Sequence, residues 1–228
     1  MTDRPILFSA PMVRALLAGT KKQTRRILKP KPRGTPWFWA GDEVDPTPGW
    51  FDGYEAGREP CGEATMEVND PIKVRILVGD RLWVRETWQG LTCGDYRPTK
   101  QEPCEVRYAA TDPCADLDVA ARGYPWRPSI FMPRFASRLT LTVTDVRVER
   151  LQDISEADAI AEGCGQYSSS TPLSRPFNPE WKGIYREGYA ELWNQINGPG
   201  AWEANPWVAA YTFTVNHSNI DQIAKEAA

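Results

Sequence analysis

The chain has 228 residues, of which 41% are hydrophobic and 25% are charged, a composition typical of a globular domain with a sizeable core. The formal net charge is -3, so any case for nucleic-acid binding has to rest on a local cluster of cations. No apolar run approaches the roughly 20 residues of a membrane helix, and no apolar signal segment follows the N-terminus. We therefore expect a cytoplasmic protein with no membrane contact and no obligate protein partner.

Histidine and cysteine usage limits the chemistry. The single histidine, His217, lies near the C-terminus, so Ser-His-Asp, Cys-His and multi-histidine metal mechanisms are not expected. Proton transfer would then depend on Lys, Glu, Asp, Tyr or Cys side chains. The five cysteines are irregularly spaced, which argues against a disulfide framework. A zinc site made from four of them stays open as an alternative, but we expect no metal and no other cofactor.

The first quarter of the chain begins with regular structure and then changes in charge. Residues 6–9 are predicted to form a strand, and residues 11–17 a helix that ends at Gly19. The segment 21–33 carries seven basic residues and no acidic residue. The next region, about 34–78, is rich in Pro, Gly, Trp and acidic residues, which predicts an insertion with little regular structure.

Two strands are predicted in the middle of the chain. Residues 81–86 alternate so that Leu82 and Val84 face one side, with Trp83 and Arg85 on the other. The region from about 89 to 132 is expected to be a second irregular insertion, with one strand at 105–108. The strongest β pattern of the chain covers residues 137–151, with a possible bulge near Thr144 and Asp145.

The remaining elements complete the prediction of fold class. Helices are predicted from Ser155 to Gly163 and over 183–197, and a final strand over 207–215. We expect an α+β domain around a mainly antiparallel sheet or small barrel with flanking helices. In this interpretation, residues 1–215 form a single domain with insertions at about 34–78 and 89–132. A polar tail, 216–228, follows with a weak helical pattern that could be frayed.

The segment after Gly19 combines an amine, a hydroxyl and several cations. Lys21 precedes Thr24 by three residues, and Lys22, Arg25 and Arg26 surround them. Nearby cations and burial both disfavour an ammonium, and a neutral amine can accept a proton from a hydroxyl. The alternatives are an anion-binding loop, a solvated basic face, or a strand that begins at the threonine.

Three segments, in this order, resemble the ASCH domain family, whose members have a PUA-like β-barrel. They are a helix followed by Gly19-x-Lys21-x-x-Thr24-x-Arg26, a Gly79-Asp80 turn that leads into a strand, and a strand that ends at 151–156 before a helix closed by Glu162-Gly163. The resemblance covers about residues 5–33, 76–90, 134–165 and 205–215. The length and the Trp-rich insertions are similar to the larger ASCH proteins that phages and prophages carry.

One branch of this family consists of small bacterial amidohydrolases that remove the acyl group from N4-acetylcytidine with a lysine, a threonine and a glutamate. The resemblance implies that Lys21, Thr24 and Glu162 are catalytic. Thr24 would attack the acyl carbonyl, Lys21 would take its proton, and Glu162 would protonate the leaving nitrogen or hold the lysine. Arg25 departs from the family, which has an apolar residue there. This departure and the greater length leave the substrate open.

Four residues are predicted to contact the substrate: Arg25, Arg26, Trp83 and Arg85. The arginines would bind phosphate and the tryptophan would stack on a base, although a Trp in a strand is more often part of the core. We expect an enzyme that hydrolyses an N4-acylated cytosine nucleoside or a related modified base. The alternatives are a non-catalytic module that binds RNA or single-stranded nucleic acid through residues 21–33, and an interaction protein that uses the acidic insertion.

Overall fold

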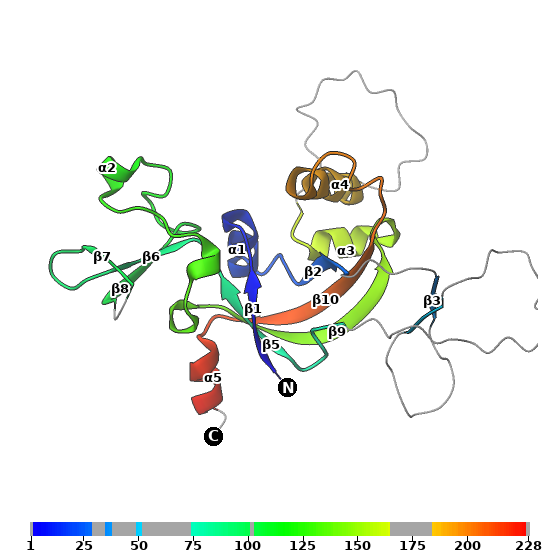
Figure 1. The fold of residues 1–228 in the computed structure, drawn as a ribbon, viewed down its shortest axis with the longest axis horizontal. Helices are drawn as coiled ribbons and strands as arrows, with labels where there is room; N and C mark the ends of the chain where they lie inside the picture. Colours follow the sequence, from blue (N-terminus) through cyan, green and yellow to red (C-terminus); the bar gives the residue numbers. More distant parts are fainter. Residues whose placement is uncertain are drawn as a thin grey trace, which may run out of the picture.

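A five-stranded sheet forms the centre of the computed structural model, which describes residues 2–28, 35–37, 49–51, 74–100, 103–164 and 184–226. Its strand order is β1-β5-β9-β10-β2 (Figure 1). β1 pairs with β5 in parallel, and the other three pairings are antiparallel. The strands are β1 (Asp3–Leu7), β2 (Gln23–Ile27), β5 (Arg81–Arg85), β9 (Thr140–Arg150) and β10 (Trp207–Asn216). The expected α+β class with a mainly antiparallel sheet is confirmed.

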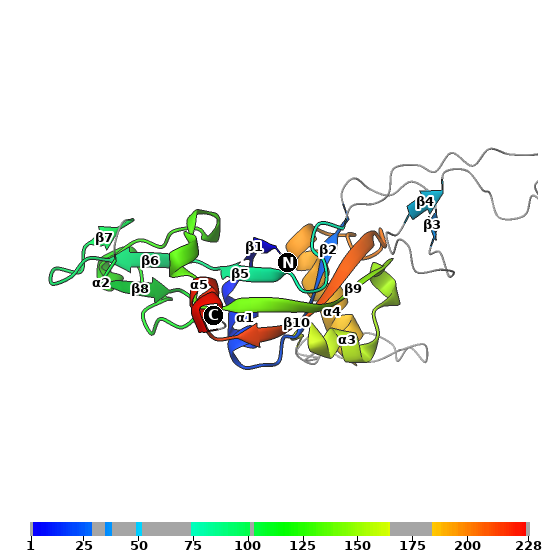
Figure 2. The same cartoon turned by 90° about the horizontal axis from the view of Figure 1, so that it is seen from below.

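The two outer strands of this sheet do not pair, so the sheet does not close into a barrel. β9 and β10 are long and bend together, which gives the sheet its curvature (Figures 1 and 2). Among the described residues, no backbone ladder joins β1 to β2. The contact across this seam is a side-chain one, because Arg26 Nη2 donates to the Leu7 carbonyl oxygen at 3.0 Å. The predicted curved sheet is therefore present, but it is open between β1 and β2.

One face of the sheet carries the main core. The helix α1 (Ala10–Leu17) covers it and buries Val13 and Leu16 completely. Pro11 suits the first turn of α1, and Gly19 has a φ of +70° just after the helix end, as the sequence predicted. The predicted strand at 6–9 was placed too late, because β1 ends at Leu7 and Ser9 is already the N-cap of α1. The sheet residues of this core are Ile6, Leu82, Val84, Leu141, Val143 and Phe213, and Leu139, just before β9, joins them.

The opposite face of β10 and β2 is covered by α3 (Glu156–Ala161) and α4 (Ile184–Asn197), which lie side by side (Figure 1). The Ser155 side chain accepts a hydrogen bond from the Asp158 amide, so the predicted helix start is confirmed. A second core lies between these helices and the sheet. Its buried residues are Leu151, Ile154, Ala159, Tyr189, Trp193 and Val208.

The predicted bulge in β9 is present at Thr144. Val143 pairs with Phe213 and Asp145 pairs with Thr212, so Thr144 has no partner in the ladder. An extra residue of this kind bends a strand and increases its twist. The bulge therefore contributes to the curvature that brings the two edges of the sheet near each other.

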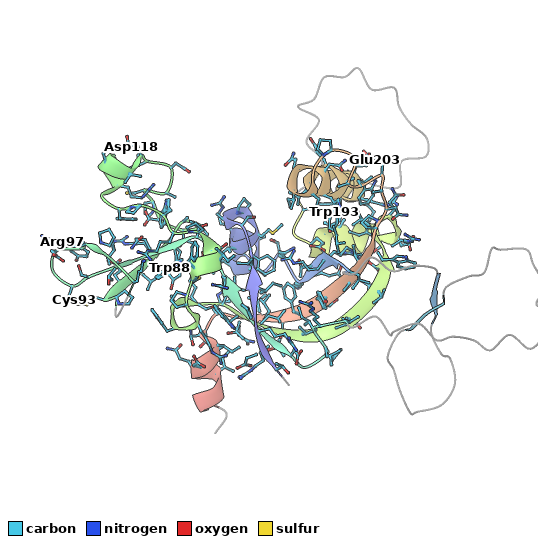
Figure 3. All side chains as sticks on the ribbon, in the orientation of Figure 1. Trp88, Cys93, Arg97, Asp118, Trp193 and Glu203 are labelled. Carbon is cyan, nitrogen blue, oxygen red and sulfur yellow. A yellow bond between two sulfur atoms is a disulfide. The ribbon has the colours of Figure 1, made fainter. Side chains whose placement is uncertain are left out.

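The second predicted insertion contains more regular structure than expected. β6 (Trp88–Leu91), β7 (Pro98–Thr99) and β8 (Glu105–Tyr108) form a separate three-stranded sheet, of which only β8 was predicted. Figure 3 shows Trp88 where this lobe joins the body, and Cys93 and Arg97 at its far end. A disulfide joins Cys93 to Cys104, a bridge that the irregular cysteine spacing did not predict. Paired in this way, these two thiols are not available as zinc ligands.

The other elements are short or terminal. β3 (Thr35–Trp37) pairs with β4 (Gly49–Phe51) inside the first predicted insertion, and 38–48 and 52–73 lie outside the described residues. The remaining helices are α2 (Val119–Arg122), the 3-10 turns Ser129–Phe131, Arg134–Ala136 and Leu151–Asp153, and α5 (Ile220–Glu226). Ile220 is completely buried, so the start of the tail packs on the domain instead of fraying. None of the helices in the described ranges is long and apolar enough to cross a membrane.

Candidate active site

Lys21 and Glu162 form a buried ion pair. Lys21 Nζ lies 2.7 Å from Glu162 Oε2 and also donates to the Glu162 carbonyl oxygen at 2.8 Å. The two residues are 141 positions apart, and their backbones form an isolated antiparallel bridge. Lys21 is 1% exposed and Glu162 is 6% exposed. The amine and the acid that the sequence analysis assigned to one site are therefore in direct contact and shielded from water.

Gly163 allows this close approach. Its φ is +78°, a conformation that costs residues other than glycine energy. A Cβ at this position would lie 3.1 Å from the Cβ atoms of both Ala15 and Lys21. The end of α3 can thus meet the end of α1 and Lys21 only because residue 163 has no side chain.

Thr24 lies in β2, so the alternative that it belongs to a strand is the one observed. It pairs with Tyr211 of β10 and is 1% exposed. Within the described part of the chain, its hydroxyl makes no hydrogen bond. Because side chains alternate along a strand, Thr24 shares its face of the sheet with Arg26. Its neighbour Arg25, which contacts Glu162, faces the other side of the sheet. Among the described residues, Thr24 is therefore buried and close to the Lys21–Glu162 pair in sequence, but no polar contact joins it to that pair.

The Phe8 ring connects the two sides of the seam between β1 and β2. The Lys21 ammonium lies 5.7 Å from the centre of this ring, and the Arg26 guanidinium lies 5.3 Å from it. Cations near an aromatic face are attracted by its electron density. Burial lowers the pKa of Arg26, and the negative charge of Glu162 acts in the opposite direction. Lys21 and Arg26 thus both lie within about 6 Å of the centre of one aromatic ring.

Arg25 is enclosed by acidic groups and is not available to a ligand in this conformation. Its side chain has no exposed surface. Its Nε and Nη2 donate to Glu149 Oε1 at 2.9 and 2.6 Å, and its Nη1 lies 3.3 Å from Glu162 Oε1. Nη2 also lies 3.4 Å from Asp158 Oδ2. The predicted substrate contact is therefore a buried ion-pair centre next to the catalytic candidates.

Two more polar residues, Gln23 and Arg147, belong to the cluster that Arg25 forms with Glu149, Asp158 and Glu162. Gln23 accepts from Arg25 Nη1 at 2.6 Å and donates to Asp158 Oδ1 at 3.1 Å. Arg147 donates to the same Asp158 oxygen at 2.9 Å from the solvent side. Burial tends to raise the pKa of Asp158, but hydrogen bonds from Gln23, Ser155 and Arg147 outweigh it, so this pKa is lowered. The cluster therefore keeps cations and carboxylates next to one another.

Tyr189 and Cys164 are close to Glu162 and were not predicted as site residues. The Tyr189 hydroxyl lies 3.5 Å from Glu162 Oε1, and burial together with the charge of Glu162 holds its pKa well above the usual range. Burial, and secondarily Glu162, raises the pKa of the Cys164 thiol to about 11. Both groups are therefore neutral at physiological pH. The sequence marked Tyr189 only as part of the apolar stripe of α4.

Trp83 and Arg85 are not brought together with Lys21. They lie on the face of β5 opposite Leu82 and Val84, whose side chains are in the core that Phe8 joins. The Arg85 guanidinium lies 5.2 Å from the centre of the Trp83 ring and donates to the Ile130 carbonyl oxygen. Burial lowers the pKa of Arg85. These two residues form a separate pair on the outer face of the sheet.

One cavity lined by described residues lies away from the Lys21–Glu162 pair. It has a volume of about 320 Å³ and lies at the start of α3, at the opposite end of that helix from Glu162. Its lining residues are Gln152, Asp153, Ile154, Ser155, Glu156 and Arg186. Within the described ranges, no group of three His, Cys, Asp or Glu side chains could hold a metal ion. Because Lys21 is 1% and Glu162 6% exposed, a ligand would reach this pair only after a local opening of the structure.

Comparisons with known protein families, with curated protein sequences and with solved structures find no match for this chain. The chemistry of the site therefore has to be argued from its own residues.

Proposed function

We propose that this chain is an amidohydrolase that removes the acyl group from an N4-acylated cytosine nucleoside or a related modified base. The supporting observation is the 2.7 Å contact between Lys21 Nζ and Glu162 Oε2, which is buried next to the start of β2, the strand that carries Thr24. Buried groups that can exchange protons, next to a potential nucleophile, are a recurring feature of active sites. The proposal includes membership of the ASCH family and a PUA-like sheet, with which the curved five-stranded arrangement is compatible.

The proposed reaction has two stages. The first starts from the form of the pair in which the proton lies on Glu162 and the Lys21 amine is neutral, and Thr24 Oγ bonds to the acyl carbon while its proton passes to that amine. The bond between the acyl carbon and N4 then breaks, and the leaving nitrogen takes a proton from Glu162, which yields the free amino group of cytosine. In the second stage, Glu162 takes a proton from the water that attacks the threonine ester while Lys21 returns its proton to Thr24 Oγ, which releases a carboxylic acid and restores all three side chains.

The Lys21–Glu162 pair is buried, which suits it to proton transfer better than a position on the surface would. Electrostatic interactions are stronger where water is excluded, and Lys21, Thr24 and Glu162 are each 6% exposed or less. Glu162 is the C-cap of α3, where the helix dipole disfavours a carboxylate. Lys21 and Arg25, which both contact Glu162, offset this effect.

The test is to incubate the purified protein with N4-acetylcytidine and follow the absorbance change as the amide is lost. Thr24→Val keeps the branched shape of the side chain in β2 but removes the hydroxyl, so we expect the turnover to be lost. Thr24→Ser keeps a hydroxyl and should retain activity. Thr20→Val is the matched control, because Thr20 is exposed and its hydroxyl donates only to the Ala15 carbonyl oxygen. No turnover of several N4-acyl nucleosides by the wild type would remove this substrate class.

The two charged residues need variants that are checked for folding. Lys21→Ala and Glu162→Ala should each reduce kcat by about 10²–10⁴-fold, the usual contribution of a positioned acid or base. Removing one partner of a buried pair also destabilises the fold, so Glu162→Gln, which keeps the shape, is measured alongside with a thermal unfolding curve. Normal rates in folded variants would refute the assigned roles.

Nucleic-acid binding without catalysis is the second candidate. Among the described cations of the basic segment, Lys22 is exposed and Arg26 is half-buried, whereas Arg25 is enclosed. Phosphate contacts of this kind would give binding that weakens steeply with salt. A titration with RNA and single-stranded DNA at low salt measures it, and Lys22→Ala should weaken any such binding. Absence of binding at low salt would eliminate this function.

A further inference from the structure

We infer that Arg25 is a positioning residue that divides the two carboxylate oxygens of Glu162 between different tasks. Arg25 holds Oε1, which leaves Oε2 directed at the Lys21 amine. As a statement about catalysis, this inference rests on the proposed function. As a statement about the position of Glu162, it can be tested on its own.

The contacts of Glu162 are separated by oxygen atom. Oε1 lies 3.3 Å from Arg25 Nη1 and 3.5 Å from the Tyr189 hydroxyl. Oε2 lies 2.7 Å from Lys21 Nζ. A carboxylate that is held through one oxygen cannot rotate about its terminal bond without losing that contact. The arrangement therefore fixes which oxygen meets the amine.

Arg25 is itself held from three sides. Glu149 Oε1 accepts from both Nε and Nη2, and Gln23 Oε1 accepts from Nη1 at 2.6 Å. The ring centre of Tyr189 lies 5.9 Å from the guanidinium carbon. Since the guanidinium is planar and carries five donors in a fixed geometry, it can hold Glu149 and Glu162 at the same time. A lysine amine on a flexible stem cannot bridge the two in this way.

Arg25 also stands where the resemblance to the family places an apolar residue. An apolar side chain there would give Glu162 Oε1 no cationic partner. The contacts to Glu149 and Asp158 supply the opposite charges that a buried arginine needs. Arg25, held in place by its acidic partners, therefore supplies the cationic contact that fixes Glu162.

Arg147 provides a matched control within the same cluster. It contacts Asp158 at 2.9 Å and Glu149 at 3.6 Å, two of the three carboxylates that surround Arg25. Among the described residues, no contact joins Arg147 to Glu162. A substitution of Arg147 therefore removes a cation from the cluster without touching the oxygen that Arg25 holds.

The test compares Arg25→Lys, Arg25→Gln and Arg147→Gln by kinetics on N4-acetylcytidine and by NMR of the ¹⁵N-labelled lysine ammonium groups. We expect Arg25→Lys to lower kcat about tenfold or more with KM within about twofold, because a misplaced acid mainly affects the chemical step. The Lys21 ammonium signal, which exchanges slowly with water when buried and paired, should shift or disappear. Arg147→Gln should leave both kcat and this signal unchanged.

A purely structural role for Arg25 would give a different result. In that case Arg25→Lys would lower the unfolding temperature but keep kcat and the Lys21 signal at their wild-type values, which overturns the inference. If Arg25→Gln fails to fold, the test rests on kcat and the Lys21 signal of Arg25→Lys, which keeps the charge. If the wild type hydrolyses no N4-acyl nucleoside, the proposed function fails. The Lys21 signal in Arg25→Lys still shows whether Arg25 positions Glu162.

Discussion

Replacing Gly163 with alanine should destabilise the protein through two effects that can be measured separately. The first is the backbone conformation, since a φ of +78° costs an alanine about 1–2 kcal/mol. The second is crowding, because the new methyl group would lie 3.1 Å from the Cβ atoms of Ala15 and Lys21. Crowding in a packed interior costs about 1–3 kcal/mol. We expect a total loss of about 3 kcal/mol.

Gly19→Ala isolates the first effect. Gly19 has a φ of +70°, similar to that of Gly163, but a Cβ there would have nothing within 4 Å. This variant should lose only about 1–2 kcal/mol. For a chain of this size, a loss of about 1 kcal/mol in unfolding free energy lowers the thermal unfolding midpoint by about 2–4 °C. The thermal midpoint of Gly163→Ala should therefore lie roughly 10 °C below that of the wild type.

The assay is equilibrium unfolding in urea, followed by circular dichroism at one pH for the wild type and both variants. Equal m-values are required, because a change in m would mean that the unfolded or native state had changed in compactness. Equal losses of stability in the two variants would refute the reasoning, since the contact with Ala15 and Lys21 would then carry no cost.

Three further predictions concern the network, the lobe and the tail. Because the folded structure lowers the pKa of Asp158 below its ordinary value of 3.8, Asp158 contributes stability that is present above that pH and lost as the pH falls through the folded pKa. The difference in unfolding free energy between the wild type and Asp158→Asn should therefore shrink on acidification, and a difference that stays constant with pH would contradict this. Reducing the Cys93–Cys104 disulfide, which closes a loop of 11 residues, should destabilise the small lobe by about 3 kcal/mol, measured as loss of amide protection in β6 and β8; unchanged protection would argue against this. Asn219 Nδ2 donates to the Arg134, Phe135 and Ser137 carbonyl oxygens. Asn219→Ala should therefore lower the unfolding free energy by about 2 kcal/mol and increase amide exchange in α5, and unchanged exchange there would contradict this.

The elements that the sequence predicted correctly are those with a strong local pattern. α1, with its following Gly19, and α3, with its Ser155 cap, follow from capping and periodicity alone. The two faces of β5 follow from strand alternation, and the bulge at Thr144 follows from the break in the alternation of β9. These signals depend on neighbours in sequence, so no tertiary information was needed.

The features that were missed depend on contacts between distant residues. β6 and β7 are short and carry no clear alternation, and they are stabilised by pairing with each other and with β8. The acidic partners of Arg25 lie 124 residues or more along the chain, so no local pattern could distinguish it from a surface cation. A small barrel was one of the two expected forms of the sheet, but whether the two edges of a sheet meet depends on the curvature of the whole sheet.

The bridge between Lys21 and Glu162 has a consequence for assembly. Closing a flexible loop of 141 residues costs about 4 kcal/mol in chain entropy, so this contact gains its stability only once the intervening strands are in place. Neither half of the polypeptide contains both the amine and the acid. Two fragments cut within the β6–β8 lobe would each lack the complete Lys21–Glu162 pair, so the proposed hydrolysis would return only on reassociation and would report a completely assembled sheet.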